Sequence, residues 1–133
     1  VQLKYIKKSI HKRKLISNLY YRKLEEIKSI KLPTLKSNIN YNFAYFPIEI
    51  IPNKEASRDE LYEFLKSKNI FARRYFYPLI SETKAYENIC SEEKKDLINS
   101  HKLANQILCL PIFPDLKLSK VMYICDLIKI KLS

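Results

Sequence analysis

The sequence predicts an α/β (α+β) fold in which a small β-sheet packs with helices and a long helix opens the chain. Stretches with helical spacing of apolar residues alternate with short stretches rich in aromatic and β-branched residues, in the order α-β-α-β-α-β-α. Hydrophobic residues make up 47% of the 133 residues, which is enough for one core. The chain has no internal repeat and no low-complexity linker, so a single domain over residues 1–133 is expected.

The first predicted element is a long helix over residues 3–30. Apolar side chains recur along it at spacings of three and four, the period of one helix face, and they are Leu3, Ile6, Ile10, Ile16, Leu19, Tyr20, Leu24 and Ile27. Pro33 closes the segment. A strand is predicted next, over residues 41–51, because aromatic and β-branched residues dominate there. Pro47 has no amide hydrogen, which indicates an edge strand or a bulge at that position.

A second helix is predicted to begin at Ser57. This residue fits an N-cap, and Glu60 three positions later completes a capping box. The buried stripe of this helix is expected to hold Leu61, Phe64 and Leu65. Asn69 can adopt the left-handed conformation that ends a helix where glycine is lacking.

The remainder of the chain is predicted to supply two more strands and two more helices. Residues 70–76 form a strand, and the polar stretch 81–99 forms a loop with a short helical turn. A helix is predicted over 100–106 and an apolar strand over 107–112. Ser119 is predicted to cap the last helix.

Composition restricts the possible functions. The chain contains no glycine, which excludes glycine-rich phosphate loops, dinucleotide-binding fingerprints and nucleophile elbows. No apolar run reaches the roughly 18 residues of a membrane span, and no signal pattern opens the chain, so a cytoplasmic location is expected. The net charge of +11 favours anionic partners, either phosphorylated small molecules, nucleic acid or anionic lipid, although a composition rich in Lys, Asn and Ile also follows from an AT-rich genome.

The titratable residues give no catalytic set. The cysteines are widely spaced without a C-x-x-C pair, so reduced buried thiols rather than a zinc site are expected at Cys90, Cys109 and Cys125. His101 and Cys109 lie eight residues apart, which no helix face brings together, and His11 is expected to be solvated. Adjacent carboxylates point in different directions on a helix and cannot act as an acid/base pair. Surface charges are therefore expected at Glu25, Glu26, Glu92 and Glu93.

The most unusual segment, residues 71–79, reads Phe-Ala-Arg-Arg-Tyr-Phe-Tyr-Pro-Leu at the end of a predicted strand. Strand alternation places three side chains on one side, Arg73, Tyr75 and Tyr77, and the opposite side receives Arg74 and Phe76. One side can thus present a guanidinium and two phenols to an anionic ligand that contains a ring. The alternative is a strand with one buried aromatic face and a solvated arginine.

The basic part of the first helix is a second candidate site. Its side chains could follow a phosphate backbone, and they are Lys7, Lys8, His11, Lys12, Arg13 and Lys14. The alternative is a solvated helix face. The sequence contains no known nucleic-acid-binding motif, so nucleic acid is the less favoured partner.

Four segments, in order, resemble the C-terminal region of the DegT/DnrJ/StrS-type nucleotide-sugar aminotransferases. They are residues 1–6 with Arg13, Ile16, Tyr20 and Leu24; residues 57–70; residues 72–79; and Ala104 with 107–112, Val121 and Ile124. Together they cover nearly the whole chain. The third segment looks most like the branch that acts on dTDP-linked keto-6-deoxy sugars, although many other members carry a His-Tyr pair where this chain has Tyr75-Phe76.

The resemblance implies the C-terminal small domain of a fold-type I aminotransferase, with a mostly antiparallel sheet. Residues 1–30 would be the interdomain helix and residues 41–133 the sheet-and-helix body. In this family a lysine of the large domain forms a Schiff base with pyridoxal phosphate, an amino donor such as glutamate loads the cofactor, and a keto-sugar nucleotide receives the amine. That chemistry serves amino-sugar biosynthesis, including surface polysaccharides such as the O-antigen of lipopolysaccharide.

By the same resemblance, the sugar-nucleotide pocket is expected to be lined by Arg73, Arg74, Tyr75 and Tyr77. The implied partners are the nucleotide-sugar substrate, the protein's own large domain and a second copy in a homodimer. No lysine of this chain matches the cofactor motif, so no catalytic, cofactor-binding or metal-binding residue is assigned and the chain alone is expected to be inactive. A basic nucleic-acid-binding module and a non-catalytic structural subunit remain the alternatives.

Overall fold

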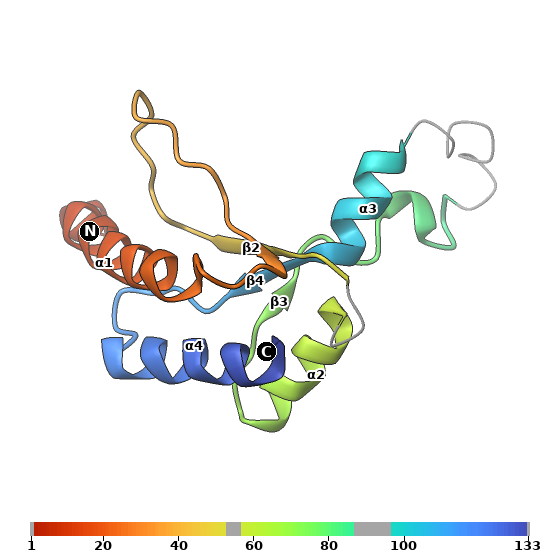
Figure 1. Ribbon diagram of the computed structural model, residues 1–133. Coiled ribbons are helices and arrows are strands. Elements are labelled where there is room, and N and C mark those ends of the chain that lie inside the picture. Colours follow the sequence, from red (N-terminus) through yellow and green to blue (C-terminus); the bar gives the residue numbers. More distant parts are fainter. Residues whose placement is uncertain (1, 53–56, 87–96, 133) are drawn as a thin grey trace.

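A computed structural model describes residues 2–52, 57–86 and 97–132. Among them, four strands form one antiparallel sheet in the order β1-β2-β4-β3. The strands are β1 (Ile30–Lys31), β2 (Phe46–Ile50), β3 (Arg73–Arg74) and β4 (Ile107–Leu110). The helices are α1 (Ile6–Leu24), α2 (Arg58–Ser67), α3 (Ile98–Gln106) and α4 (Leu118–Leu132), with short 3-10 turns at Gln2–Tyr5 and Ile80–Glu82. The α/β prediction with a mostly antiparallel sheet is confirmed (Figure 1).

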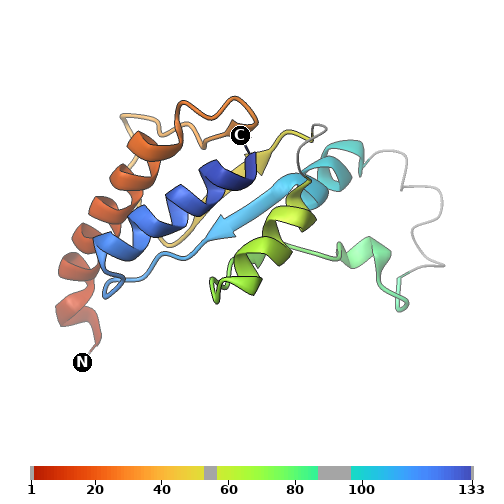
Figure 2. The same cartoon turned by 60° about the horizontal axis from the view of Figure 1, so that its bottom comes forward.

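One face of the sheet carries the core. Helices α1, α2 and α4 lie on that side, and α3 projects beyond the end of the sheet (Figures 1 and 2). Alternate residues of β2 and β4 point into the core and are fully or almost fully buried, namely Phe46, Ile48, Ile50, Leu108 and Leu110. The opposite face holds Pro47 and Cys109, which pair across the two central strands. No helix of the described residues is long and apolar enough to span a membrane.

The long N-terminal helix is shorter than predicted. Helix α1 ends at Leu24, and Ile30 belongs to strand β1, opposite Ile50. The apolar period of the sequence continues through Ile27 because the turn after the helix also packs against the core. The helical spacing of apolar residues therefore extends over three different elements, namely a helix, a turn and a two-residue edge strand.

Strand β2 occupies only the second half of the predicted range 41–51. Phe43 has a φ of 50°, which an extended strand does not allow, and the side chain of Asn42 accepts from the amide of Ala44 in a local turn. Strand β1 pairs only with Glu49 and Ile50, so Pro47 faces no neighbouring strand on that side. The predicted edge strand is thus wrong, since β2 lies between β1 and β4, but Pro47 is tolerated because β1 does not extend to it.

The helix signals near residue 57 are confirmed and the one at residue 119 is wrong. Ser57 accepts from the amide of Glu60, and the Glu60 carboxylate accepts from the amide of Ser57. Asn69 has a φ of 59°, as a glycine-like stop requires. Helix α4 begins one residue before Ser119, because the carbonyl of Lys117 already accepts from the amides of residues 120 and 121. Ser119 therefore lies inside the first turn.

The last two predicted strands are both shorter in the structure. Strand β3 spans only Arg73–Arg74 of the predicted range 70–76, and β4 ends at Leu110, before Pro111. The predicted helix at 100–106 is confirmed and begins two residues earlier. The predictions for Cys90, Glu92 and Glu93 lie outside the described residues.

Candidate functional site at the end of strand β3

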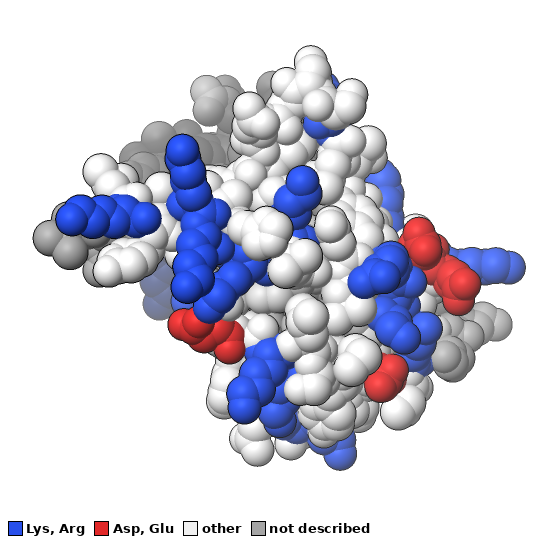
Figure 3. All heavy atoms as spheres, turned by 90° about the vertical axis from the view of Figure 1, so that its left-hand side faces the viewer, with Lys and Arg blue, Asp and Glu red and all other residues white. Residues whose placement is uncertain are grey.

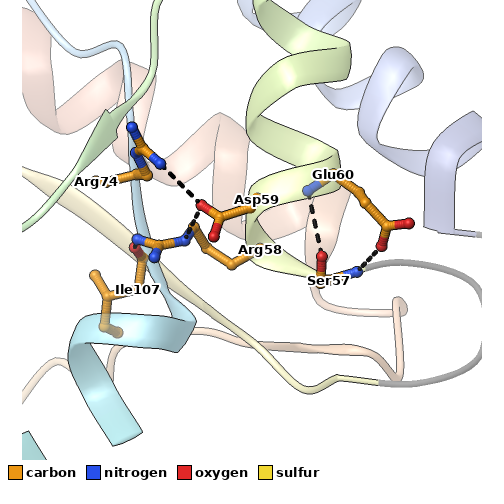
Figure 4. A network of polar contacts seen from close by, with 6 residues as sticks. All are labelled: Ser57, Arg58, Asp59, Glu60, Arg74 and Ile107. Carbon is orange, nitrogen blue, oxygen red and sulfur yellow. Dashed lines mark hydrogen bonds and ion pairs between the residues drawn. The ribbon is translucent and has the colours of Figure 1, made fainter. Parts of the chain in front are cut away.

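The candidate site lies where β3 leaves the sheet beside the first turn of α2. Arg74 pairs with Leu108, so its side chain leaves the sheet on the face that the helices cover. Arg73 pairs with Cys109 and leaves on the opposite face. Helix α2 begins at Arg58, directly after the capping box, and its first turn lies with Arg58 and Asp59 against the edge of β3 (Figure 4).

Two arginines share one carboxylate at this site. The Nε of Arg58 lies 2.9 Å from Oδ1 of Asp59, and Nη1 of Arg74 lies 3.3 Å from the same oxygen (Figure 4). Arg58 also donates from Nη1 to the carbonyl of Ile107 at 3.4 Å. Two guanidinium groups around one carboxylate leave a net positive charge, which is suited to an anionic ligand.

Arg58 is the inner member of this pair, since only 1% of its surface is exposed. Burial lowers the pKa of Arg58, and the neighbouring Asp59 opposes that shift. Its Nη2 is buried and has no hydrogen-bond partner among the described residues. Arg74 remains partly exposed and can reach a ligand directly.

Two tyrosine rings complete the site. The guanidinium of Arg74 lies 4.6 Å from the ring centre of Tyr62 and 5.0 Å from that of Tyr77. The guanidinium of Arg58 lies 4.7 Å from the Tyr77 ring as well. All three distances suit cation–π attraction. Tyr77 remains 42% exposed, so one edge of the site is an accessible phenol next to two cations.

The other two predicted residues, Arg73 and Tyr75, lie on the open face of the sheet. The ring centre of Tyr75 is 4.9 Å from that of Tyr45 and 3.9 Å from that of Phe76. Desolvation and a hydrogen bond with Tyr45 raise the pKa of Tyr75. Burial raises the pKa of Cys109 to about 11, and the nearby Arg73 opposes this shift.

The structure therefore divides the four predicted residues into two pairs. Strand alternation correctly separates Arg73 and Tyr75 from Arg74, but its placement of Tyr77 beside Tyr75 is wrong. Alternation fails there because the strand ends at Arg74 and residues 75–76 form a turn. Tyr77 thereby joins Arg74, and Phe76 stacks on Tyr75.

Sequence reasoning missed Arg58, Asp59 and Tyr62. A signal was present, since Arg58 precedes Leu61 and Leu65 by three and seven positions and so shares the buried stripe of α2. An arginine at such a position must find polar partners inside the protein. Asp59 and Tyr62 gave no comparable signal, because their role depends on the neighbouring strand.

A depression of about 510 Å³ adjoins the site and is lined in part by Tyr77, Pro78, Leu79 and Ile80. A larger groove of about 860 Å³ lies between α1 and the start of α4, with Leu15, Leu118 and Met122 in its wall. The lining of that groove includes Tyr21 and Arg22, whereas the lining of the depression includes Tyr77 and no arginine. The depression is nevertheless the better position for a ligand with both charge and a ring, because the ring of Tyr77 in its wall lies 5.0 Å from the guanidinium of Arg74.

Other reactive side chains do not form a second centre. Nδ1 of His101 lies 2.9 Å from Oε1 of Glu82 near the surface, and His11 is exposed, as predicted. Cys125 is buried in the core, and burial raises its pKa to about 12, so it is a poor nucleophile at neutral pH. No group of three potential metal ligands occurs in the described part of the chain.

The basic face of α1 is not a continuous stripe. The helix contains seven lysines and arginines and no acidic residue, but Lys12 pairs with Asp115 at 2.9 Å and Arg13 donates to the carbonyl of Asn42. Figure 3 shows blue side chains scattered over this side of the molecule with uncharged surface between them. No observation here favours a nucleic-acid track over a solvated face.

Comparison with known proteins places the chain in a family. The model of the DegT/DnrJ/EryC1/StrS aminotransferase family matches residues 1–129. The chain belongs to this family. The resemblance inferred from the sequence is thereby confirmed.

Two curated relatives of this family member are dTDP-4-amino-4,6-dideoxy-D-glucose transaminases. The Escherichia coli enzyme is 42% identical over 128 residues, which are 96% of this chain and 34% of the relative. The Shigella dysenteriae enzyme is 36% identical over 129 residues, which are 97% of this chain and 35% of the relative. The chain thus spans about a third of the length of these relatives.

Solved aminotransferase structures contain the same fold. PseC of Helicobacter pylori, an aminotransferase involved in the biosynthesis of pseudoaminic acid, matches with a TM-score of 0.85 at 20% identity, over 98% of this chain and 34% of PseC. DesI, whose crystal structure was analysed in the presence of its TDP-sugar product, matches with a TM-score of 0.85 at 21% identity, over 96% of this chain and 32% of DesI. The predicted fold relationship to aminotransferases is confirmed by these structures.

Proposed function

We propose that this chain is the C-terminal small domain of a pyridoxal-phosphate-dependent aminotransferase that transfers an amino group, supplied by a donor such as glutamate, to a dTDP-linked keto-6-deoxy sugar. The two curated relatives, both dTDP-4-amino-4,6-dideoxy-D-glucose transaminases, support the substrate class. In this proposal residues 1–30 connect to the large domain, residues 41–133 form the body, and the complete enzyme is a homodimer.

The observation that carries the proposal is the group of arginines and phenols at the end of β3. Arg74 has an accessible guanidinium, only partly neutralised by Asp59, which can donate two parallel hydrogen bonds to a diphosphate. Tyr77 offers a ring and a hydroxyl next to it, at the mouth of the depression lined by Pro78 and Leu79. These contacts would hold the nucleotide and orient the sugar toward the reacting carbon.

The second pair, Arg73 and Tyr75, would border the same ligand from the open face of the sheet. Arg73 is exposed, so its charge adds to the attraction of a diphosphate without a desolvation cost. Tyr75 is held against Tyr45, which keeps its ring from rotating freely. We assign both residues to substrate binding rather than to proton transfer, because neither contacts a general base within the described residues.

The cofactor does not fit the described residues of this chain. Pyridoxal phosphate supplies the carbonyl carbon that carries the amino group, and it is held by a lysine shielded from water. Every lysine of the described residues is at least partly exposed, including Lys66, whose Nζ lies 5.9 Å from the ring centre of Tyr62 and whose side chain is 52% exposed. We therefore assign the cofactor to the part of the enzyme that this chain does not represent, and we expect the chain alone to be inactive.

The test is amination of a dTDP-linked 4-keto-6-deoxy or 3-keto-6-deoxy sugar by the full-length enzyme with pyridoxal phosphate and glutamate. We expect Arg74→Lys to raise KM for the sugar nucleotide about tenfold, since a lysine loses the bidentate contact. KM for glutamate should stay unchanged. The matched control is Arg22→Lys on exposed α1, with no change expected. Failure of the purified enzyme to aminate either sugar would contradict the proposal.

A further inference from the structure

The largest fully buried side chain of the described residues is charged. Arg58 is 1% exposed, in a position that a leucine or methionine would fill at no electrostatic cost. Among the described residues its polar contacts are the ion pair of Nε with the Asp59 carboxylate and the hydrogen bond from Nη1 to the Ile107 carbonyl, and neither Nε nor Nη2 has a hydrogen-bond partner. Burial of a charge with incomplete pairing lowers stability, so a role other than stability is indicated.

The contacts of Arg58 indicate that role. Its guanidinium touches both groups that govern the accessible part of the site. It binds the Asp59 oxygen that also binds Arg74, and it lies 4.7 Å from the ring centre of Tyr77. Arg74 and Tyr77 are themselves at the surface, whereas Arg58 is enclosed by the core and the start of β4. Arg58 is thus the fixed member of the group.

We propose that Arg58 is a positioning residue for the sugar-nucleotide site. It orients Arg74 through the shared Asp59 carboxylate, and its buried guanidinium contacts the ring of Tyr77 and holds that ring in place. This inference rests on the proposed function and adds a residue that does not itself touch the ligand. It also explains the shared carboxylate. Asp59, held by Arg58, neutralises only part of the charge of Arg74 and leaves the remainder for a diphosphate.

A lysine cannot reproduce this arrangement. Arg58 uses Nε for Asp59 and Nη1 for the carbonyl of Ile107, two directions that a planar guanidinium provides at once (Figure 4). An ammonium group is a point charge and lacks the flat surface beside the Tyr77 ring. Arg58→Lys therefore keeps the charge and removes the geometry, which makes it the decisive variant.

The experiment compares steady-state kinetics of the full-length enzyme carrying Arg58→Lys, Arg74→Lys or both. We expect Arg58→Lys to raise KM for the dTDP-linked keto-sugar about tenfold with kcat within about twofold, since binding rather than the reacting carbon is affected. The KM of the double variant should rise by clearly less than the product of the two single rises, because part of the effect of Arg58 passes through Arg74 and only the remainder through Tyr77. Additive effects of the two substitutions would overturn the inference.

A spectroscopic readout tests the position of Tyr77 without substrate. In fluorotyrosine-labelled enzyme, the signal that disappears in Tyr77→Phe should shift in Arg58→Lys and stay in place in Ile128→Val, a conservative change of a buried apolar residue of α4. An unshifted Tyr77 signal in Arg58→Lys would overturn the inference. A comparable shift or KM change in Ile128→Val would do so too, because a loss of general stability would then suffice.

Asp59→Asn keeps the inference testable if Arg58→Lys does not fold. The Asp59 side chain is 52% exposed, so no apolar core contact is lost, but the shared carboxylate charge is removed and Arg58 loses its ion-pair partner. We expect KM for the sugar nucleotide to change at least threefold, whereas an unchanged KM would overturn the inference. If the wild-type enzyme aminates no sugar nucleotide, the proposed function fails, and the Tyr77 spectra still decide whether Arg58 positions that ring.

Discussion

The two faces of the sheet are built differently. The face toward α1, α2 and α4 presents apolar side chains of β2 and β4 that are almost completely enclosed, such as Ile48 and Leu108. The open face and the end of β3 present arginines, tyrosines and a single buried thiol, Cys109. The comparison indicates that the enclosed face determines stability, whereas the open face and the strand end are free to serve a ligand.

The largest expected effect is the loss of stability when a buried side chain of the enclosed face is truncated. Leu108 is completely buried at the centre of β4, so Leu108→Ala should lower the free energy of unfolding of the chain by about 2–5 kcal/mol. Urea unfolding followed by circular dichroism measures the change. Arg73→Ala, on the neighbouring strand but on the open face, should change it by about 0.5 kcal/mol or less. Equal losses in the two variants would show that the two faces do not differ in this way.

Alkaline pH should distinguish the same two faces through their cysteines. Burial raises the pKa of Cys109 to about 11 and of Cys125 to about 12. Thiols of the unfolded chain ionise near their ordinary value of about 8.5, so the unfolded state loses protons first. The free energy of unfolding should therefore be highest below about pH 8.5, where both thiols are protonated in both states. It should fall progressively as the pH rises toward the folded-state pKa values of Cys109 and Cys125.

The measurement is the urea midpoint between pH 7 and pH 11 for the wild type, Cys109→Ala and Cys125→Ala. Each substitution should flatten the alkaline fall, and Cys125→Ala should flatten it more because the pKa of Cys125 is raised further. Val121→Ala is the control, since it removes core volume without a titrating group and should leave the slope unchanged. A larger effect from Cys109 would assign the stronger desolvation to the open face.

The sequence predicted the features that depend on neighbouring residues and missed those that depend on contacts between distant segments. Periodicity and capping residues identified α2, with Ser57 and Asn69 at its ends, because those signals depend on neighbours within one turn of helix. Strand β1 was missed, since the pairing of Ile30 with Ile50 joins residues twenty positions apart. The candidate residues at 73–77 came from local composition, whereas their partners Arg58 and Asp59 belong to another element.

The smallest expected effect concerns the point where the two regions meet. Helix α2 places Leu61 and Leu65 in the core and Arg58 in the site, and the hydroxyl of Ser57 accepts from the amide of Glu60 at its start. Ser57→Ala should therefore lower the free energy of unfolding by about 1 kcal/mol, and Ser57→Gly by only a few tenths, measured by urea unfolding.

The same cap variants test whether the site depends on the helix end or on the core. Arg58 is held by its burial and by the carbonyl of Ile107, neither of which involves Ser57. Ser57→Ala should thus leave KM of the full-length enzyme for the sugar nucleotide within about twofold of the wild type, since only the fraying of the first turn increases. A tenfold rise in KM would instead show that the cap, rather than the enclosed face, holds Arg58 and Asp59 in place.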